Sequence, residues 1–89
     1  MKPNWKSLEN DLRNYIQSDR DYDGSVSAAN GRTRCLQTLY GSIPYGIKTE
    51  RFVDMLLMRP TWNVEDSVKW CLAWCQREYE RRPVAPKIF

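Results

Sequence analysis

Two cysteines are the residues of this chain whose type and spacing come closest to chemistry. They stand at 71 and 75 in the stretch WCLAWC, residues 70–75. Side chains four apart on a helix have Cβ atoms roughly 5–6 Å apart, whereas a disulfide needs about 3.8 Å. A structural zinc needs four nitrogen or sulfur ligands, and Cys35 is the only further thiol in a chain without histidine. We therefore expect no transition-metal site, and we predict that Cys71 and Cys75 are buried thiols that pack as small apolar side chains.

Catalysis is not expected. The chain contains no histidine, so it lacks the side chain that most readily transfers protons near neutral pH. It also contains no glycine-rich phosphate loop, no nucleophile elbow and no pair of carboxylates at a meaningful spacing. The sequence predicts a protein that is not an enzyme and needs no cofactor, apart from the calcium considered below.

Two tryptophans and two arginines lie beside the cysteine stripe. On a helix the cysteines belong to one regular apolar face, and Trp70 and Trp74 fall on a neighbouring face, followed by Arg77 and Arg81. Trp and Arg are enriched where proteins bind one another. We predict that these four residues form a protein-binding surface. The alternative is that a second helix of the same chain covers the tryptophans, as in any small bundle.

The stretch DRDYDGSVSAAN, residues 19–30, contains regularly spaced oxygen ligands around a glycine. It resembles an EF-hand calcium loop over these twelve positions, with candidate ligands and turn residue at Asp19, Asp21, Asp23, Gly24 and Ser25. The last position departs from the family, because Asn30 stands where a bidentate glutamate is expected. The resemblance implies at most a weak calcium site.

A nucleic-acid-binding function is the second hypothesis. Arg32 and Arg34 lie at the start of one predicted helix, 32–40, where a phosphate could contact backbone N–H groups. The next predicted helix, 49–59, carries Arg51, and the pair resembles a helix-turn-helix. The formal net charge of the chain is only +3, which is mild for a nucleic-acid-binding protein.

Helices must position these residues, because apolar residues recur at steps of three and four and no segment alternates as a strand would. We predict one all-α domain, 1–89, with four helices at approximately 4–18, 32–40, 49–59 and 64–82. The alternative is that the second helix begins at Ser27 and contains Gly31 in its interior. A polar Asp/Gly loop is expected at 19–31 and a short tail at 83–89. The third helix should bury Phe52, Val53, Leu56 and Leu57.

The function expected from these features is binding to another protein. The chain of 89 residues lacks 18 consecutive apolar residues and an N-terminal signal segment, so we expect neither a membrane span nor export from the cytoplasm. Three cysteines, an odd number, favour reduced thiols. In size and aromatic content the chain is similar to small phage and mobile-element proteins that inhibit host enzymes or defence systems stoichiometrically. The partner and the oligomeric state are not predicted.

Overall fold

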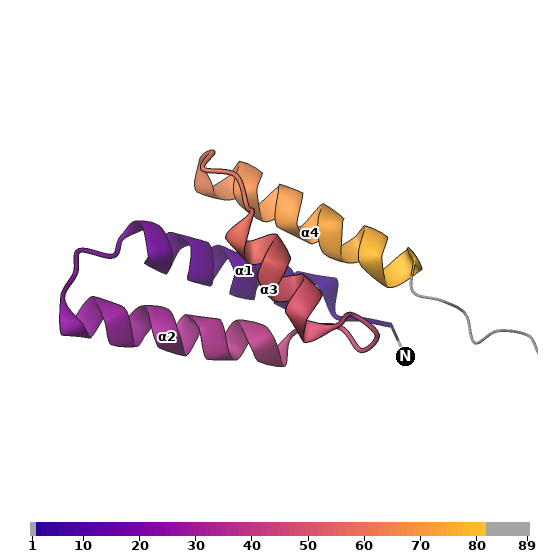
Figure 1. Ribbon diagram of the computed structural model, residues 1–89, viewed down its shortest axis with the longest axis horizontal. Helices are drawn as coiled ribbons and strands as arrows, with labels where there is room; N and C mark the ends of the chain where they lie inside the picture. The colour runs from indigo at the N-terminus through magenta and orange to yellow at the C-terminus, as the bar shows by residue number, and fades with distance from the viewer. Residues whose placement is uncertain (1, 82–89) are drawn as a thin grey trace, which may run out of the picture.

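The computed structural model describes residues 2–81, which form an all-α structure without strands (Figure 1). This part of the chain contains helices α1 (Trp5–Arg20), α2 (Val26–Gly41), α3 (Thr49–Leu57) and α4 (Val64–Arg81). The predicted fold class is therefore confirmed. The tail 83–89, and residue 82 at the predicted end of the last helix, lie outside the described residues. No helix within 2–81 has the length and apolar content that crossing a membrane would require.

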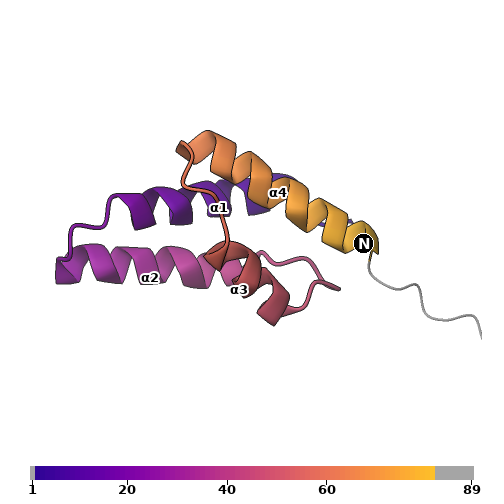
Figure 2. The same cartoon turned by 45° about the horizontal axis from the view of Figure 1, so that its top comes forward.

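Helix α1 lies between α2 and α4 and packs against both (Figures 1 and 2). It is antiparallel to α4, because Trp5 at its start meets Tyr79 near the end of α4, with ring centroids 5.6 Å apart. It is also antiparallel to α2, because Asp19 near its end pairs with Arg32 at 3.3 Å. The shorter α3 packs on α4.

Each helix contributes to one apolar core. Its members are Leu8, Leu12, Ile16, Leu39, Ile47, Phe52, Met55, Leu56, Val68, Cys71 and Cys75. One polar side chain is fully buried among the described residues, that of Ser67. Its hydroxyl donates to the Pro60 carbonyl at 3.0 Å and accepts from Arg20 Nη2 at 2.8 Å, so its burial leaves no hydrogen-bonding group unsatisfied.

The second helix begins at Val26, six residues before the predicted bound at 32 and one residue before the alternative start at Ser27. Ser25 caps it, because its hydroxyl accepts from the Ala28 N–H at 3.1 Å. Gly31 lies inside the helix in open space, although a glycine favours a loop at this point of the sequence. The cap, the two helix-favouring alanines at 28 and 29, and the ion pair between Arg32 and Asp19 outweigh the cost of one glycine, about 1 kcal/mol. The polar loop is therefore confined to 21–25 rather than 19–31, and Gly24 turns it with φ +88°.

The remaining helix bounds agree with the predictions to within two residues. α1 continues to Arg20, and α3 ends at Leu57, just before Pro60. The buried face of α3 differs, since Met55 is 2% exposed whereas Leu57, predicted to be buried, is 78% exposed. Phe52, Met55 and Leu56 follow the three-and-four spacing that packing on α4 requires, and this spacing turns Leu57 toward solvent.

Candidate functional site

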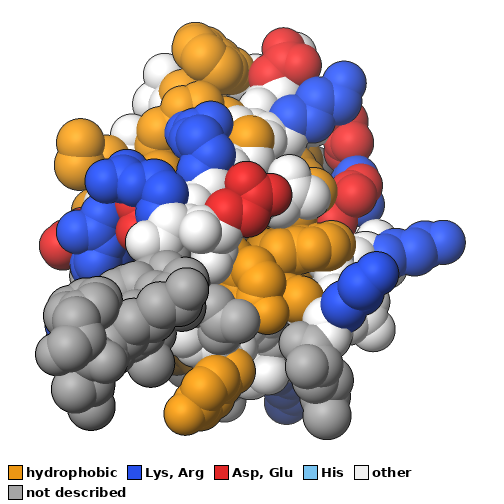
Figure 3. Space-filling model, turned by 90° about the vertical axis from the view of Figure 1, so that its right-hand side faces the viewer, with side chains coloured by type: hydrophobic (Ala, Val, Ile, Leu, Met, Phe, Trp, Pro, Cys, Tyr) orange, Lys and Arg blue, Asp and Glu red, His pale blue; other side chains and the backbone are white. Residues whose placement is uncertain are grey.

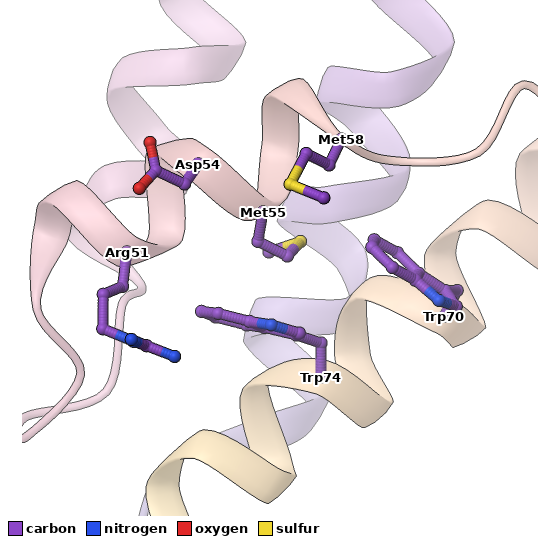
Figure 4. Close-up of a pocket in the computed structure, with 6 residues that line it drawn as sticks. All are labelled: Arg51, Asp54, Met55, Met58, Trp70 and Trp74. Carbon is purple, nitrogen blue, oxygen red and sulfur yellow. The ribbon is translucent and has the colours of Figure 1, made fainter.

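A groove runs between α3 and α4, and both predicted tryptophans lie in it (Figure 4). It has a volume of about 230 Å³ and is lined by Arg51, Asp54, Met55, Met58, Trp70 and Trp74. We call this feature the α3–α4 groove. Trp70 and Trp74 are half-buried and pack against the core. Helix α3 therefore covers one side of the indoles, as the alternative interpretation expects, and leaves the other side accessible.

The helical spacing of the lining residues explains how the groove forms. Met55 lies in α3 and Met58 follows its last residue, three positions later, whereas Trp70 and Trp74 stand four apart on α4. The two pairs line opposite walls of the groove. Figure 4 shows the thioether side chains lying over the gap between the two indoles. Methionine is unbranched and adapts its shape to what it contacts. The groove thus presents flat aromatic surface on one wall and adaptable apolar surface on the other.

One end of the α3–α4 groove is rich in arginine. Arg51 donates to Glu78 from Nε at 3.2 Å and from Nη2 at 2.8 Å, and Arg81 lies 3.8 Å from the same carboxylate. Arg77 is exposed on α4. The face of the molecule at this end shows Lys and Arg side chains on either side of a hydrophobic group (Figure 3). Arg51, a candidate nucleic-acid-binding residue, thus also lines the groove.

Three large apolar side chains near the junction of α3 and α4 are exposed. Leu57 is 78% exposed, Met58 76% and Trp62 56%. They belong to the end of α3 and the connector to α4, and Met58 also lines the groove. None of the three is predicted from the sequence as a surface residue. The signal for Trp62 is nevertheless present, because a tryptophan between Pro60 and the cap of the next helix stands outside every apolar stripe.

The residues of the EF-hand-like stretch are divided between α1, a short loop and α2. Asp19 belongs to α1 and pairs with Arg32 and Arg59, and residues 26–30 belong to α2. Asp23 accepts a hydrogen bond from the Ser25 N–H at 2.9 Å. Bonding to Ser25 lowers the pKa of the Asp23 carboxyl. Within residues 2–81, no three Cys, Asp or Glu side chains gather as metal ligands would.

The cysteines are buried as predicted. Cys71 and Cys75 are both 0% exposed, and both are free thiols. Burial raises the pKa of Cys71 to about 11. Burial, with a smaller effect of Cys71 and Glu78, raises the pKa of Cys75 to about 12. Both thiols are therefore protonated at neutral pH and unsuited to act as nucleophiles or ligands.

The candidate nucleic-acid residues do not form one surface. Arg32 is engaged with Asp19, and its guanidinium lies 3.9 Å from the centre of the Tyr22 ring. Arg34 is exposed on α2. Arg51 lies in the first turn of α3, paired with Glu78 on α4. The structure thus separates the arginine of α3 from the two arginines of α2.

No family model, curated protein or solved structure matches this chain. Function must therefore be inferred from the chain's own residues. Among them, the α3–α4 groove and the apolar side chains beside it combine partly accessible tryptophan, methionine and arginine.

Proposed function

We propose that this protein is not an enzyme and acts by binding another protein through the α3–α4 groove. The observation that carries the proposal is the partial exposure of Trp70 and Trp74 in a groove whose opposite wall includes the exposed Met58. A partly apolar groove with accessible aromatic side chains is typical of an interaction site. Binding would remove this surface from water.

The composition of the groove supports protein recognition over small-molecule binding. Tryptophan and arginine carry much of the energy of protein interfaces, and they are most effective when neighbouring polar contacts exclude water. The indoles of Trp70 and Trp74 supply the apolar centre, and Arg77 and Arg81 supply exposed charges at one end. Each square ångström of apolar surface buried contributes about 25 cal/mol, so a partner that covers the remaining exposed surface of both half-buried indoles gains on the order of 1–3 kcal/mol.

Stoichiometric inhibition is the mode of action that we infer for such a binder. The chain has no histidine, and the thiols of Cys71 and Cys75 are buried with raised pKa values. Neither observation favours turnover of a substrate. A small helical protein of this kind would act by occupying the surface of a larger protein, in the manner of phage or mobile-element inhibitors of host enzymes and defence systems.

Charge reversal at the arginine end tests the proposed surface. Arg77→Glu combined with Arg81→Glu should abolish capture of a partner from a lysate, because the variant carries acidic groups where the wild type is basic. Both side chains are exposed, so the melting temperature should change little. Arg34→Glu is the matched control, since Arg34 is an exposed helical arginine on α2, and it should retain capture. A double variant that keeps both its melting temperature and its partner would contradict the proposed surface.

A further inference from the structure

Helix α4 carries an outward stripe of opposite charges separated by tryptophan. Asp66, Trp70, Trp74, Arg77 and Arg81 follow one another at steps of four, four, three and four, so they share one face of the helix. The stripe is acidic at its start, aromatic in the middle and basic at its end. Asp66, Arg77 and Arg81 are exposed, and both tryptophans are half-buried.

The charges at the two ends of this stripe are too far apart to pair within one molecule. Asp66 and Arg81 are separated by about 22 Å along the helix axis, at a rise of 1.5 Å per residue. The Asp66 carboxylate accepts from the side chain of its capping neighbour Asn63, at 2.9 Å, and this neutral amide does not cancel the negative charge. The side chain of Arg81 is 76% exposed and lies 3.8 Å from Glu78. Both end charges therefore remain available to another molecule.

The stripe is complementary to its own antiparallel copy. Asp66 and Arg81 lie equally far from the midpoint between Ala73 and Trp74, and so do Trp70 and Arg77. A two-fold axis through this midpoint would place Asp66 of each copy opposite Arg81 of the other copy. It would also place Trp70 of each copy opposite Arg77 of the other copy. At the axis, the small side chain of Ala73 leaves room for the indole of Trp74. A parallel arrangement would instead oppose arginine to arginine.

We propose that a second copy of this chain binds the α4 stripe, so that two α4 helices pack antiparallel about a two-fold axis. The proposal rests on the proposed function in one respect, namely that this face of α4 binds protein, and it identifies the partner. Opposite charges at both ends fix the antiparallel direction and the register. Stacking of Arg77 on Trp70 adds a cation–π contact, and the tryptophans provide the apolar centre.

Charge exchange between two variants tests this symmetry. In a dimer of Asp66→Lys, two positive charges would face each other at each end. In a dimer of Arg81→Glu, two negative charges would face each other at each end. Each variant should therefore dimerise about tenfold more weakly than the wild type, or not at all. In an equimolar mixture, one copy of each variant can form a heterodimer in which opposite charges meet at both ends. One end pairs the introduced lysine with the introduced glutamate, and the other end pairs Asp66 with Arg81. A heterodimer should therefore form, and sedimentation equilibrium across micromolar to millimolar protein measures the three association constants.

The matched control uses the same two charge changes away from the stripe. Asp21→Lys and Arg34→Glu alter exposed residues in the α1–α2 loop and on α2, so each should dimerise as the wild type does. Thermal unfolding verifies that all four variants fold. A wild type that stays monomeric to millimolar concentration would overturn the proposal. So would a dimer insensitive to Asp66→Lys and Arg81→Glu, or a mixture without a heterodimer.

The outcome for the dimer can be separated from the outcome for the proposed function. If the wild type is monomeric but Arg77→Glu with Arg81→Glu abolishes capture of a different protein, the groove binds that protein and the second-copy proposal fails. If the charge-exchange heterodimer forms but the double variant keeps its captured partner, the dimer stands and the proposed capture surface fails.

Discussion

Asp19, in the last turn of α1, forms an ion pair with Arg59, which lies between α3 and α4. The same carboxylate accepts from Arg32 on α2 at 3.3 Å. Arg59 also donates to the Leu56 carbonyl at 2.7 Å and lies 5.3 Å from the centre of the Tyr15 ring. One aspartate thus connects three segments of the chain that are distant in sequence.

Removing this carboxylate should destabilise the fold. In Asp19→Ala the guanidinium of Arg59, whose side chain is 17% exposed, loses its anionic partner. We expect the free energy of unfolding to fall by about 1–3 kcal/mol, the usual cost of leaving such a group unsatisfied. Urea unfolding measures the change. Asp21→Ala, at an exposed position, should change stability by less than about 0.5 kcal/mol. Equal effects of the two substitutions would contradict the connecting role of Asp19.

Calcium should not stabilise the protein at submillimolar concentration. Asp19 is engaged with two arginines, and Asn30, which cannot supply a bidentate carboxylate, lies inside α2. A ligand that binds only the folded state raises the melting temperature by mass action, so a calcium titration followed by thermal unfolding is decisive. A rise in melting temperature that Asp21→Ala removes would instead indicate a calcium site in this region.

The two buried thiols should make stability decrease at alkaline pH. Folding raises the pKa of Cys71 from an ordinary value near 9 to about 11. The unfolded chain therefore loses this proton at a lower pH than the folded chain, so the folded state is favoured below pH 9 and the advantage is lost as the pH rises toward 11. Burial also raises the pKa of Tyr15, with the same sign. The variant with Cys71→Ala and Cys75→Ala isolates the thiols, and its stability should fall less steeply between pH 9 and 11.

Thiol reactivity checks the same burial independently. In the native protein, a thiol reagent should modify half-buried Cys35 first, and Cys71 and Cys75 only after unfolding. Rapid native labelling of all three cysteines would contradict the packing of α4.

Nucleic-acid binding, if detected, should be weak and unspecific. The net charge is +3, and Arg32 and Arg51 are each paired with a carboxylate. Two of the three candidate arginines are thus engaged within the protein, so affinity for a duplex should be low and should fall further with salt. Fluorescence anisotropy at several salt concentrations measures this dependence. Submicromolar affinity for one particular duplex at physiological salt would favour the nucleic-acid hypothesis over protein binding.

Regular apolar spacing made most of the fold predictable from sequence. Leu8, Leu12 and Ile16 are buried on α1, and Val68, Cys71 and Cys75 are buried on α4, because a stripe at steps of three and four must face a core. The sequence left the start of α2 open between residues 27 and 32. Its first turns lack such a stripe, and they are helical because of the cap at Ser25 and the pairing of Arg32 with α1, which depend on tertiary structure.

The candidate surface was predictable only on its α4 side. The spacing of Trp70 and Trp74 relative to the cysteines placed them beside the core stripe. The opposite wall, formed by Met55 and Met58, depends on how α3 packs across α4. The spacing of apolar residues within one helix does not predict where another helix lies on it. For the same reason, Arg51 could not be assigned to the groove before its pairing with Glu78 was known.

The limited packing of α3 has a consequence for hydrogen exchange. α3 has nine residues, and no side chain caps its N-terminus. It packs on α4 less extensively than α1 packs on α2 and α4. Its amides should therefore exchange through a partial opening of lower free energy than global unfolding, while those of α1 exchange last. That opening would widen the α3–α4 groove above Trp70 and Trp74. The groove would then accommodate partner side chains of different sizes.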